Sequence, residues 1–272
     1  MASFILVHGS FHGAWNWHKV VPLIEQAGHA VSCIDMPGHG IDHSAVHQVS
    51  LQDCVQCLIK QIDRMEPPII LVAHSRNGIV ISQAAEYRAN KIAKLVYLAA
   101  YLVPDGKSMM DFAKLDEASL VYQNIIPRTS AAQIETVRKL YRKPITRLLL
   151  HLFSKKTQRT HLLDPKAYRD ALYHDCPPEI VALAQALLTP EPNFPGFTQL
   201  QLSAAKYGSI PRTYIECLQD HAVTLKLQRL MQAESPCDKV YQLDSGHSPF
   251  FSMPARLTDI LLAEVSKAVS MS

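Results

Sequence analysis

Three residues of the kinds that carry out nucleophilic catalysis each follow a short apolar run of the sequence. Ser75 follows IILVAH, Asp220 closely follows RTYIECL, and His247 follows KVYQLDSG. A serine hydroxyl is a weak nucleophile until a base takes its proton, and an acid must orient that base. Because the carboxyl ends of parallel strands meet at one edge of a sheet, we expect the three side chains to lie together. The sequence therefore predicts a catalytic triad.

The acid of this triad has more than one candidate. Asp220 is preferred because it lies just past its strand, but Glu216 and Asp244 also lie near strand ends and stay open as alternatives. His74, the neighbour of Ser75, is expected to pack beneath the turn, since adjacent side chains of a strand point to opposite faces. His247 is therefore the predicted general base.

A second part of the predicted site is the segment VHGSFHGAW at 7–15. A His-Gly pair directly after a strand lets the backbone turn sharply, so that a following N–H group faces the serine. We assign the oxyanion hole to the backbone N–H groups of Ser10 and Arg76, and expect His8 and His12 to support the loop. Donors of this kind stabilise the charge that develops on a tetrahedral intermediate.

A pocket for a small molecule is expected beside these groups. Such pockets are lined mainly by apolar and aromatic side chains. Aromatic residues flank the site segments of the sequence. The predicted pocket residues are Gly9, Phe11, Tyr101 and Phe250.

Short apolar runs alternate with helical patterns in both end regions of the chain. Runs that are apolar on both faces and separated by helices indicate a mostly parallel sheet of about six strands, covered by helices on both sides. The expected strands cover 3–9, 29–35, 69–74, 93–100, 212–218 and 239–246. Between them, 105–209 is expected to be an inserted helical cap, and 1–104 with 210–272 the core. Ser130–Gln133 reads as a helix start, and so does Asp164 before Pro165.

The composition limits the class of protein. Hydrophobic residues make up 48% of the 272 residues and charged residues 19%, with a formal charge of +3. A basic run is lacking, which argues against nucleic acid as a partner, and no apolar stretch has the length of a membrane span. The N-terminal segment lacks the features of a leader peptide, so we expect a cytoplasmic protein, monomeric or homodimeric.

Neither a cofactor nor a metal is expected. Cys54 and Cys57 form a CxxC pair, but they lie within a helical apolar pattern and have no second pair at metal-binding spacing. We expect them to pack as small apolar side chains.

Four segments together carry a resemblance to a known family: ILVHGSFHGAWNWHKVVPLIEQAGHAVSCIDMPGHG, AHSRNG, YIECLQDHA and DSGHSPFFSMP. They are similar to the α/β-hydrolase superfamily, and more narrowly to its plant methylesterase and hydroxynitrile lyase group and related bacterial serine esterases. The resemblance implies an α/β-hydrolase fold with Ser75 as nucleophile, His247 as base, Asp220 as its orienter, and Ser10 and Arg76 as oxyanion donors. It is weak over 105–209.

Two positions favour an esterase within this group. The hydroxynitrile lyases that resemble this chain carry Thr at the position of Gly9 and Lys at the position of Ser248, which implies that this chain lacks the groups that hold cyanide. We therefore expect a carboxylesterase acting on a small-molecule ester. Lactone or amide hydrolysis by the same triad, a C–C lyase and a weakly catalytic ligand-binding receptor are the alternatives.

The turn itself departs from the family's pattern at Arg76 and Asn77. Arg76 replaces what is usually an apolar residue, and we hypothesise that it biases the pocket toward polar or anionic substrates. Asn77 replaces a glycine where a helix and a strand are expected to approach closely.

Overall fold

Six parallel strands form the central sheet of the computed structural model, which describes residues 1–128 and 160–265. The strand order is β2-β1-β3-β4-β8-β9, so the chain moves outward from β1 in one direction and then in the other. Ligands bind at such a reversal, outside the carboxyl ends of the strands. The strands are β1 (Ser3–Val7), β2 (Ala30–Ile34), β3 (Ile69–His74), β4 (Ile92–Leu98), β8 (Arg212–Cys217) and β9 (Lys239–Leu243).

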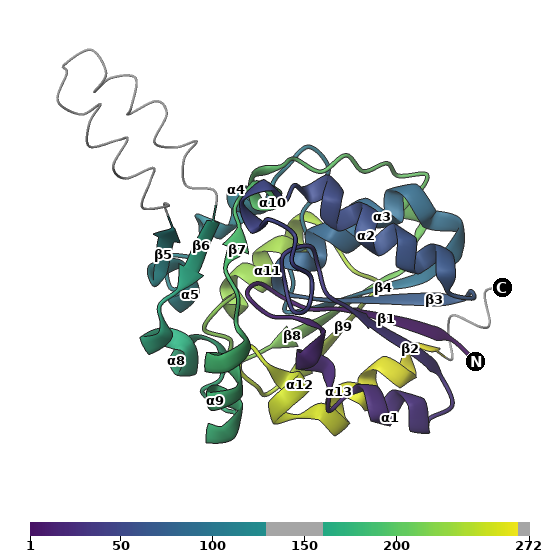
Figure 1. Cartoon of the computed structure of the whole chain (residues 1–272). Coiled ribbons are helices and arrows are strands. Elements are labelled where there is room, and N and C mark those ends of the chain that lie inside the picture. The colour runs from purple at the N-terminus through teal and green to yellow at the C-terminus, as the bar shows by residue number, and fades with distance from the viewer. Residues whose placement is uncertain (129–159, 266–272) are drawn as a thin grey trace, which may run out of the picture.

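Helices cover both faces of this sheet, as Figure 1 shows for α2 and α3 on one face and α1 and α13 on the other. The longest, α2, begins at a capping box in which Ser50 and Asp53 each bind the other's backbone N–H group. This arrangement confirms the fold class predicted from the sequence. The covering helices are α1 (Val21–Gln26), α2 (Leu51–Arg64), α3 (Gly78–Arg88), α11 (Leu225–Glu234), α12 (Pro249–Ser252) and α13 (Pro254–Ala263).

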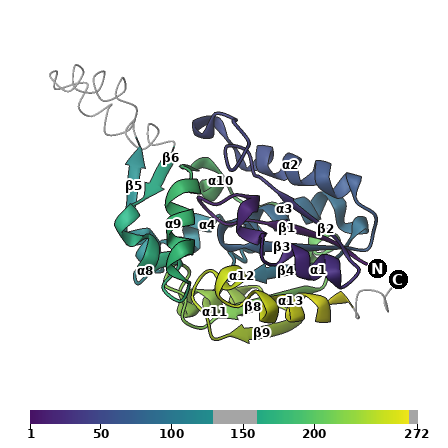
Figure 2. The same cartoon turned by 60° about the horizontal axis from the view of Figure 1, so that its bottom comes forward.

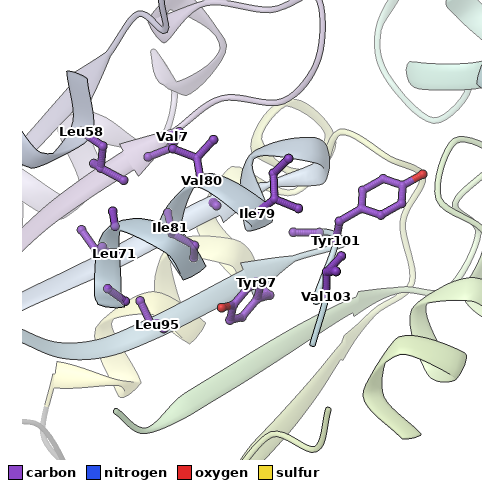
Figure 3. Close-up of a cluster of buried hydrophobic side chains, with 14 of the residues drawn as sticks. Val7, Leu58, Leu71, Ile79, Val80, Ile81, Leu95, Tyr97, Tyr101 and Val103 are labelled. Atoms are coloured by element: carbon purple, nitrogen blue, oxygen red, sulfur yellow. The ribbon is translucent and has the colours of Figure 1, made fainter. Parts of the chain in front are cut away.

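The alternation of side chains along each strand divides the core into two layers. In β1, Ile5 and Val7 join the cluster under α2 and α3, whereas Phe4 and Leu6 join the cluster under α1 and α13. Successive side chains of a strand point to opposite faces, so a strand buried on both faces must be apolar throughout. Figure 3 shows the first cluster, in which Tyr101 lies at the edge.

In the segment between β4 and β8, the described helices and strands from Met109 to Phe197 lie at one end of the sheet, away from the N-terminus (Figures 1 and 2). This segment was expected to be helical, but its described part also holds an antiparallel sheet of three strands. The strands are β5 (Ile125–Arg128), β6 (Thr160–Leu163) and β7 (Glu191–Pro192). The helices are α4 (Met109–Ala113), α5 (Leu120–Gln123), α8 (Tyr168–Leu172), α9 (Pro178–Leu187) and α10 (Phe194–Phe197). The boundaries of the cap at 105 and 209 stay a prediction.

Six short 3₁₀ helices complete the described elements: Ala14–Trp17, Val46–Gln48, Ser75–Asn77, Ala89–Lys91, Pro165–Ala167 and Tyr207–Ser209. The expected helix start at Asp164 is present, because its carboxylate accepts a hydrogen bond from the N–H of Lys166. The expected start at Ser130–Gln133 lies outside the described residues.

The CxxC pair lies on α2, where Cys54 is buried in the core and Cys57 half-buried. Burial raises the pKa of the Cys54 thiol to about 11. A thiol of this kind stays protonated and packs as an apolar group.

A buried carboxylate, Glu264, lies at the end of α13 under the sheet. Its Oε2 accepts hydrogen bonds from Lys94 Nζ and Thr213 Oγ1, both at 2.7 Å, and its Oε1 accepts one from the Tyr241 hydroxyl at 2.7 Å. Burial alone raises the pKa of this carboxyl, but these hydrogen bonds outweigh burial and lower it from 4.5 to about 2.

Acid is therefore expected to weaken the fold through Glu264. A carboxyl whose pKa is lower in the folded state stabilises the fold above its unfolded pKa, and this stability is lost as the pH falls through the folded pKa. The Glu264 contribution should be complete above about pH 4.5, amount to about 3 kcal/mol, and vanish toward about pH 2. Urea unfolding of wild type and Glu264→Gln across this range measures it. A stability difference that does not change with pH would contradict the prediction, and the exposed Glu234→Gln serves as control.

Candidate active site

The strand β3 ends in a tight turn that holds Ser75 in an unusual conformation. Ser75 has a φ of +56°, in the left-handed region that residues with a Cβ rarely adopt. Strained turns between a strand and a helix project a nucleophile above the end of a sheet. Two neighbouring segments hold this turn in place, since Tyr101 N–H donates to Ser75 O at 2.9 Å and Gly9 lies directly against it. The turn is thus built by tertiary contacts as well as by its own residues.

Glycine is required at two places around this turn. A Cβ on Gly78 would lie 2.3 Å from the carbonyl oxygen of Tyr101, and a Cβ on Gly9 would lie 2.5 Å from His74 Nδ1. The close approach of helix and strand therefore falls on Gly78, and not on Asn77 as expected from the sequence. Asn77 is buried and its Nδ2 donates to the His8 carbonyl oxygen at 2.6 Å. The asparagine thus ties the turn to the loop after β1.

His247 and Asp220 form a buried pair. His247 Nδ1–H donates to Asp220 Oδ2 at 2.6 Å, and both side chains are almost fully buried. Asp220 Oδ1 accepts hydrogen bonds from the N–H groups of Ala222 and Val223, at 2.7 and 2.9 Å, which fix the carboxylate. With Nδ1–H bound to Asp220, the other imidazole nitrogen, Nε2, can accept a proton from another group.

The two other candidate acids lie apart from His247. Asp244 accepts a hydrogen bond from Gln219 Nε2 at 2.6 Å, and Glu216 binds Arg229 at 3.3 Å. Of the three carboxylates considered from the sequence, Asp220 is the one that contacts the histidine.

His74 supports the loop that carries His247. Its Nε2–H donates to the His247 carbonyl oxygen at 2.9 Å, and the two rings lie 4.3 Å apart. The pKa of His74 is well below its ordinary value, mainly because the ring is buried and also because His247 lies nearby. His74 is therefore a neutral packing group, which agrees with its expected place beneath the turn.

Two buried histidines shape the loop after β1. His8 Nδ1–H donates to Gly9 O at 2.8 Å, and its Nε2 accepts from Met36 N–H at 3.0 Å. His12 Nδ1–H donates to Ser10 O at 2.6 Å, and burial lowers the pKa of His12 to about 3. Both rings are neutral and act as fixed hydrogen-bonding groups of the loop.

A cavity of about 640 Å³, its mouth included, brings the predicted groups together. Ser75, His247, Ser10 and Arg76 all line it, and most of the remaining wall is apolar and comes from the cap. The other lining residues are Phe11, Tyr101, Met109, Met110, Ala113, Ser119, Val121, Tyr122, Ile125, His161, Leu172, Ala222 and Val223.

Two of the four residues expected to line the pocket do not lie on its surface. Phe11 and Tyr101 line the cavity, but Gly9 packs against His74 and the Ser75 Cβ. Phe250 is fully buried behind the His74 ring, 4.9 Å from it, and therefore supports the site from the core. An aromatic residue near a catalytic loop in the sequence does not reveal which side of the loop it occupies.

Glu191 is a buried residue next to the site that was not expected from the sequence. This carboxylate of β7 accepts a hydrogen bond from Phe11 N–H at 2.6 Å, lies 3.2 Å from His39 Nε2, and forms an ion pair with Arg76. Its sequence neighbourhood, TPEPNFP, contains no signal of such a role, because the partners lie more than a hundred residues away. The ion pair also means that the charge of Arg76 is compensated inside the protein.

Within 1–128 and 160–265, there is no cluster of three or more His, Cys, Asp or Glu side chains that could bind a metal ion. In the same part of the chain, no helix combines the length and apolarity needed to span a membrane.

Known proteins with similar sequences and folds show which family this chain belongs to. Residues 4–260 match the profile described as the alpha/beta hydrolase family. The chain belongs to the α/β-hydrolase family. The chain is 35% identical over 97% of its length to putative methylesterase 11, chloroplastic, of Arabidopsis thaliana, and 31% identical over 98% to methylesterase 9 of the same plant. These α/β-hydrolase relatives confirm the resemblance to plant methylesterases.

A solved α/β-hydrolase structure shows the same overall architecture. Methylketone synthase I of tomato, solved with 2-tridecanone bound, superposes with a TM-score of 0.81 at 28% identity, over 98% of both chains. The chain spans 99% of methylesterase 9, but 65% of putative methylesterase 11 and 56% of two further putative chloroplastic methylesterases. A fold shared by an esterase and a ketone synthase does not fix the reaction, which must be argued from the site.

Proposed function

We propose that this protein is a serine carboxylesterase, with Ser75 as nucleophile, His247 as general base and Asp220 as the acid that orients it. The observation that carries the proposal is the buried His247–Asp220 hydrogen bond, beside a cavity that Ser75 also lines. The relatives named methylesterases support ester hydrolysis as the reaction.

The first half of the proposed reaction forms an acyl-enzyme. His247 Nε2 takes the proton of the Ser75 hydroxyl, and the serine oxygen attacks the ester carbonyl carbon. The carbonyl oxygen becomes an oxyanion, which the backbone N–H groups of Ser10 and Arg76 stabilise. When the tetrahedral intermediate collapses, the C–O bond to the alcohol breaks and His247 returns the proton to the leaving alkoxide.

The second half restores the enzyme. Water gives a proton to His247 and attacks the acyl carbon, and a second tetrahedral intermediate forms in the same oxyanion hole. Its collapse releases the carboxylic acid and returns the proton to Ser75. Asp220 keeps the proton of His247 on Nδ1 throughout and stabilises the imidazolium that forms.

The proposed substrate is a small ester with an apolar acid part. The wall of the cavity is formed by side chains such as Met109, Met110 and Leu172, which bind apolar groups. Methyl esters are the first alcohol part to test, because the relatives carry methylesterase in their names. A monomer or homodimer, a cytoplasmic location and the lack of a nucleic-acid partner stay predictions.

The C–C lyase alternative fits this chain less well. The lyases that resemble it carry Thr at the position of Gly9, where a Cβ would lie 2.5 Å from His74 Nδ1 and 2.9 Å from the Ser75 Cβ. Ser248, at the position of their lysine, is fully buried. Lactone or amide hydrolysis uses the same groups and is an outcome of the substrate test below.

The test combines covalent labelling with a substrate panel. A fluorophosphonate is expected to label the native protein at Ser75, as mapped by mass spectrometry, and to abolish ester hydrolysis in proportion to labelling. The panel holds methyl, ethyl and 4-nitrophenyl esters with the matching lactone and amide, and denatured protein is the control. Labelling at another residue, or turnover that survives full labelling, would overturn the proposal.

A further inference from the structure

Glu191 connects the cap to two parts of the site at once. Its Oε2 accepts the hydrogen bond from Phe11 N–H at 2.6 Å, next to the proposed oxyanion donor Ser10. In the same segment, Thr189 N–H donates to Phe11 O at 2.9 Å, so both backbone groups of Phe11 are bound by the cap. Phe11 has a φ of +65°, a conformation that needs such support. The cap thus holds the loop after β1 in place.

The other carboxylate oxygen of Glu191 pairs with Arg76, the residue that follows the nucleophile. The Arg76 and Glu191 side chains are 5% and 1% exposed, so this pair is shielded from water. Burial lowers the pKa of Arg76 to about 10, and the guanidinium therefore keeps its charge near neutral pH. A buried charge must be paired, and removing one partner leaves the other uncompensated.

The neighbouring His39 does not balance the negative charge of Glu191. Its Nε2 lies 3.2 Å from Glu191 Oε2, but burial and the nearby Arg76 lower the pKa of His39 to about 4. The ring is therefore neutral near pH 7, and its contact with the carboxylate adds no positive charge. Arg76 is the group that balances Glu191.

Arg76 borders the cavity in which the ester would lie. Among the described residues that line this cavity and the adjoining hollow toward α10, Arg76 is the one with a full charge at neutral pH. The adjoining hollow shares Ser10, Met109 and His161 with the cavity. Without its partner, Arg76 would place a positive charge beside the acyl part of a substrate, and water would screen that charge only weakly.

From these contacts we infer that Glu191 is a specificity-determining and positioning residue: it cancels the charge of Arg76 and so reserves the pocket for uncharged esters, while holding the oxyanion loop through Phe11. This inference rests on the proposed ester hydrolysis. It replaces the earlier expectation that Arg76 attracts anionic substrates, because that attraction requires an arginine without a partner. A charged substrate would bury its own charge in this pocket without a partner. The free-energy cost of that unpaired charge favours uncharged esters.

The test compares three 4-nitrophenyl esters with acyl chains of equal length: the neutral hexanoate, the anionic adipate half ester and a cationic trimethylammonium analogue. Glu191→Gln keeps an oxygen that accepts from Phe11 N–H but loses the charge. It is expected to raise the ratio of kcat/KM for the anionic over the neutral ester about tenfold or more. Arg76→Leu leaves Glu191 unpaired and is expected to shift the ratios the opposite way, toward the cationic ester.

Two further variants complete the design. The double variant Arg76→Leu with Glu191→Leu removes both charges and is expected to return the ratios to those of wild type. Glu179→Gln, at an exposed position of the cap, should leave them unchanged. A purely structural role for Glu191 would lower kcat/KM for all three esters together. If the ratios are unchanged in Glu191→Gln, the inference is wrong. If Glu191→Gln does not fold, unchanged ratios in Arg76→Leu decide in the same way.

A binding measurement separates this inference from the proposed reaction. In a Ser75→Ala background, calorimetry compares hexanoate with the neutral hexanamide. Adding Glu191→Gln is expected to tighten hexanoate relative to hexanamide about tenfold. If wild type hydrolyses no ester, the proposed function fails, but this comparison still decides the role of the charge pair. Equal changes for both ligands would overturn it.

Discussion

Replacing Ser75 with alanine is expected to lower kcat for ester hydrolysis by about 10⁶-fold, because the acyl-enzyme can no longer form. Alanine keeps the Cβ of serine, so the positive φ at this position gains no new strain. The cavity also keeps its shape, and KM should change little. Initial rates on a 4-nitrophenyl ester, together with loss of fluorophosphonate labelling, measure the effect. Residual hydrolysis above that of water is expected from the oxyanion hole and substrate binding alone.

A matched control is Ser252→Ala, which removes a hydroxyl on α12 that does not line the cavity. This variant should keep the wild-type rate and the label. Circular dichroism and thermal unfolding must show that Ser75→Ala is folded. A folded Ser75→Ala protein with more than a small fraction of wild-type kcat would contradict the assignment of the nucleophile.

Replacing Asp220 with asparagine is expected to lower kcat by about 10⁴-fold. The carboxylate accepts the Nδ1–H of His247 at 2.6 Å, and an amide at this place can present its NH₂ group to the ring instead. The imidazole then carries its proton on Nε2 and can no longer take one from Ser75. The variant should still be labelled by fluorophosphonate, but far more slowly than wild type, and the rate of labelling gives a second measure.

Asp244→Asn is the control for this substitution. Asp244 lies in the same loop as His247, three residues before it, but its carboxylate is exposed and binds Gln219. Its replacement should leave kcat within about twofold, as expected for a surface site. If Asp244→Asn or Glu216→Gln were the variant that loses activity, the assignment of the acid would be wrong.

The strands of the central sheet could be predicted from short stretches of the sequence. The six runs predicted as strands all form strands of one parallel sheet, and the run 69–74 coincides with β3. Prediction succeeded most directly for β1 and β3, which are fully buried, because a strand covered on both faces must be apolar along its whole length. The cap was predicted less well. Its described part contains β5, β6 and β7, which are short and pair with partners far away in the sequence.

The site shows the same division. Ser75, Asp220 and His247 could be selected from the sequence because each follows a strand of the sheet, and strand ends meet at one edge. The roles of Asn77 and Gly78 could not, since the close approach depends on where the Tyr101 carbonyl lies. The sequence also left three carboxylates open as the partner of His247, and the fold brings one of them to it.

The sequence by itself indicated the sheet, through the periodicity of its apolar runs, and the family, through the resemblance of four segments to known proteins. It also indicated Ser75 and His247 as candidate nucleophile and base, because each follows a strand end. Only the tertiary structure decided the environment of Arg76. From the sequence it is a bare charge beside a nucleophile, but the fold brings Glu191 from the cap to cancel it. The physical reason is that electrostatics in a buried site depend on distances between groups far apart in the chain, and a linear pattern does not encode them.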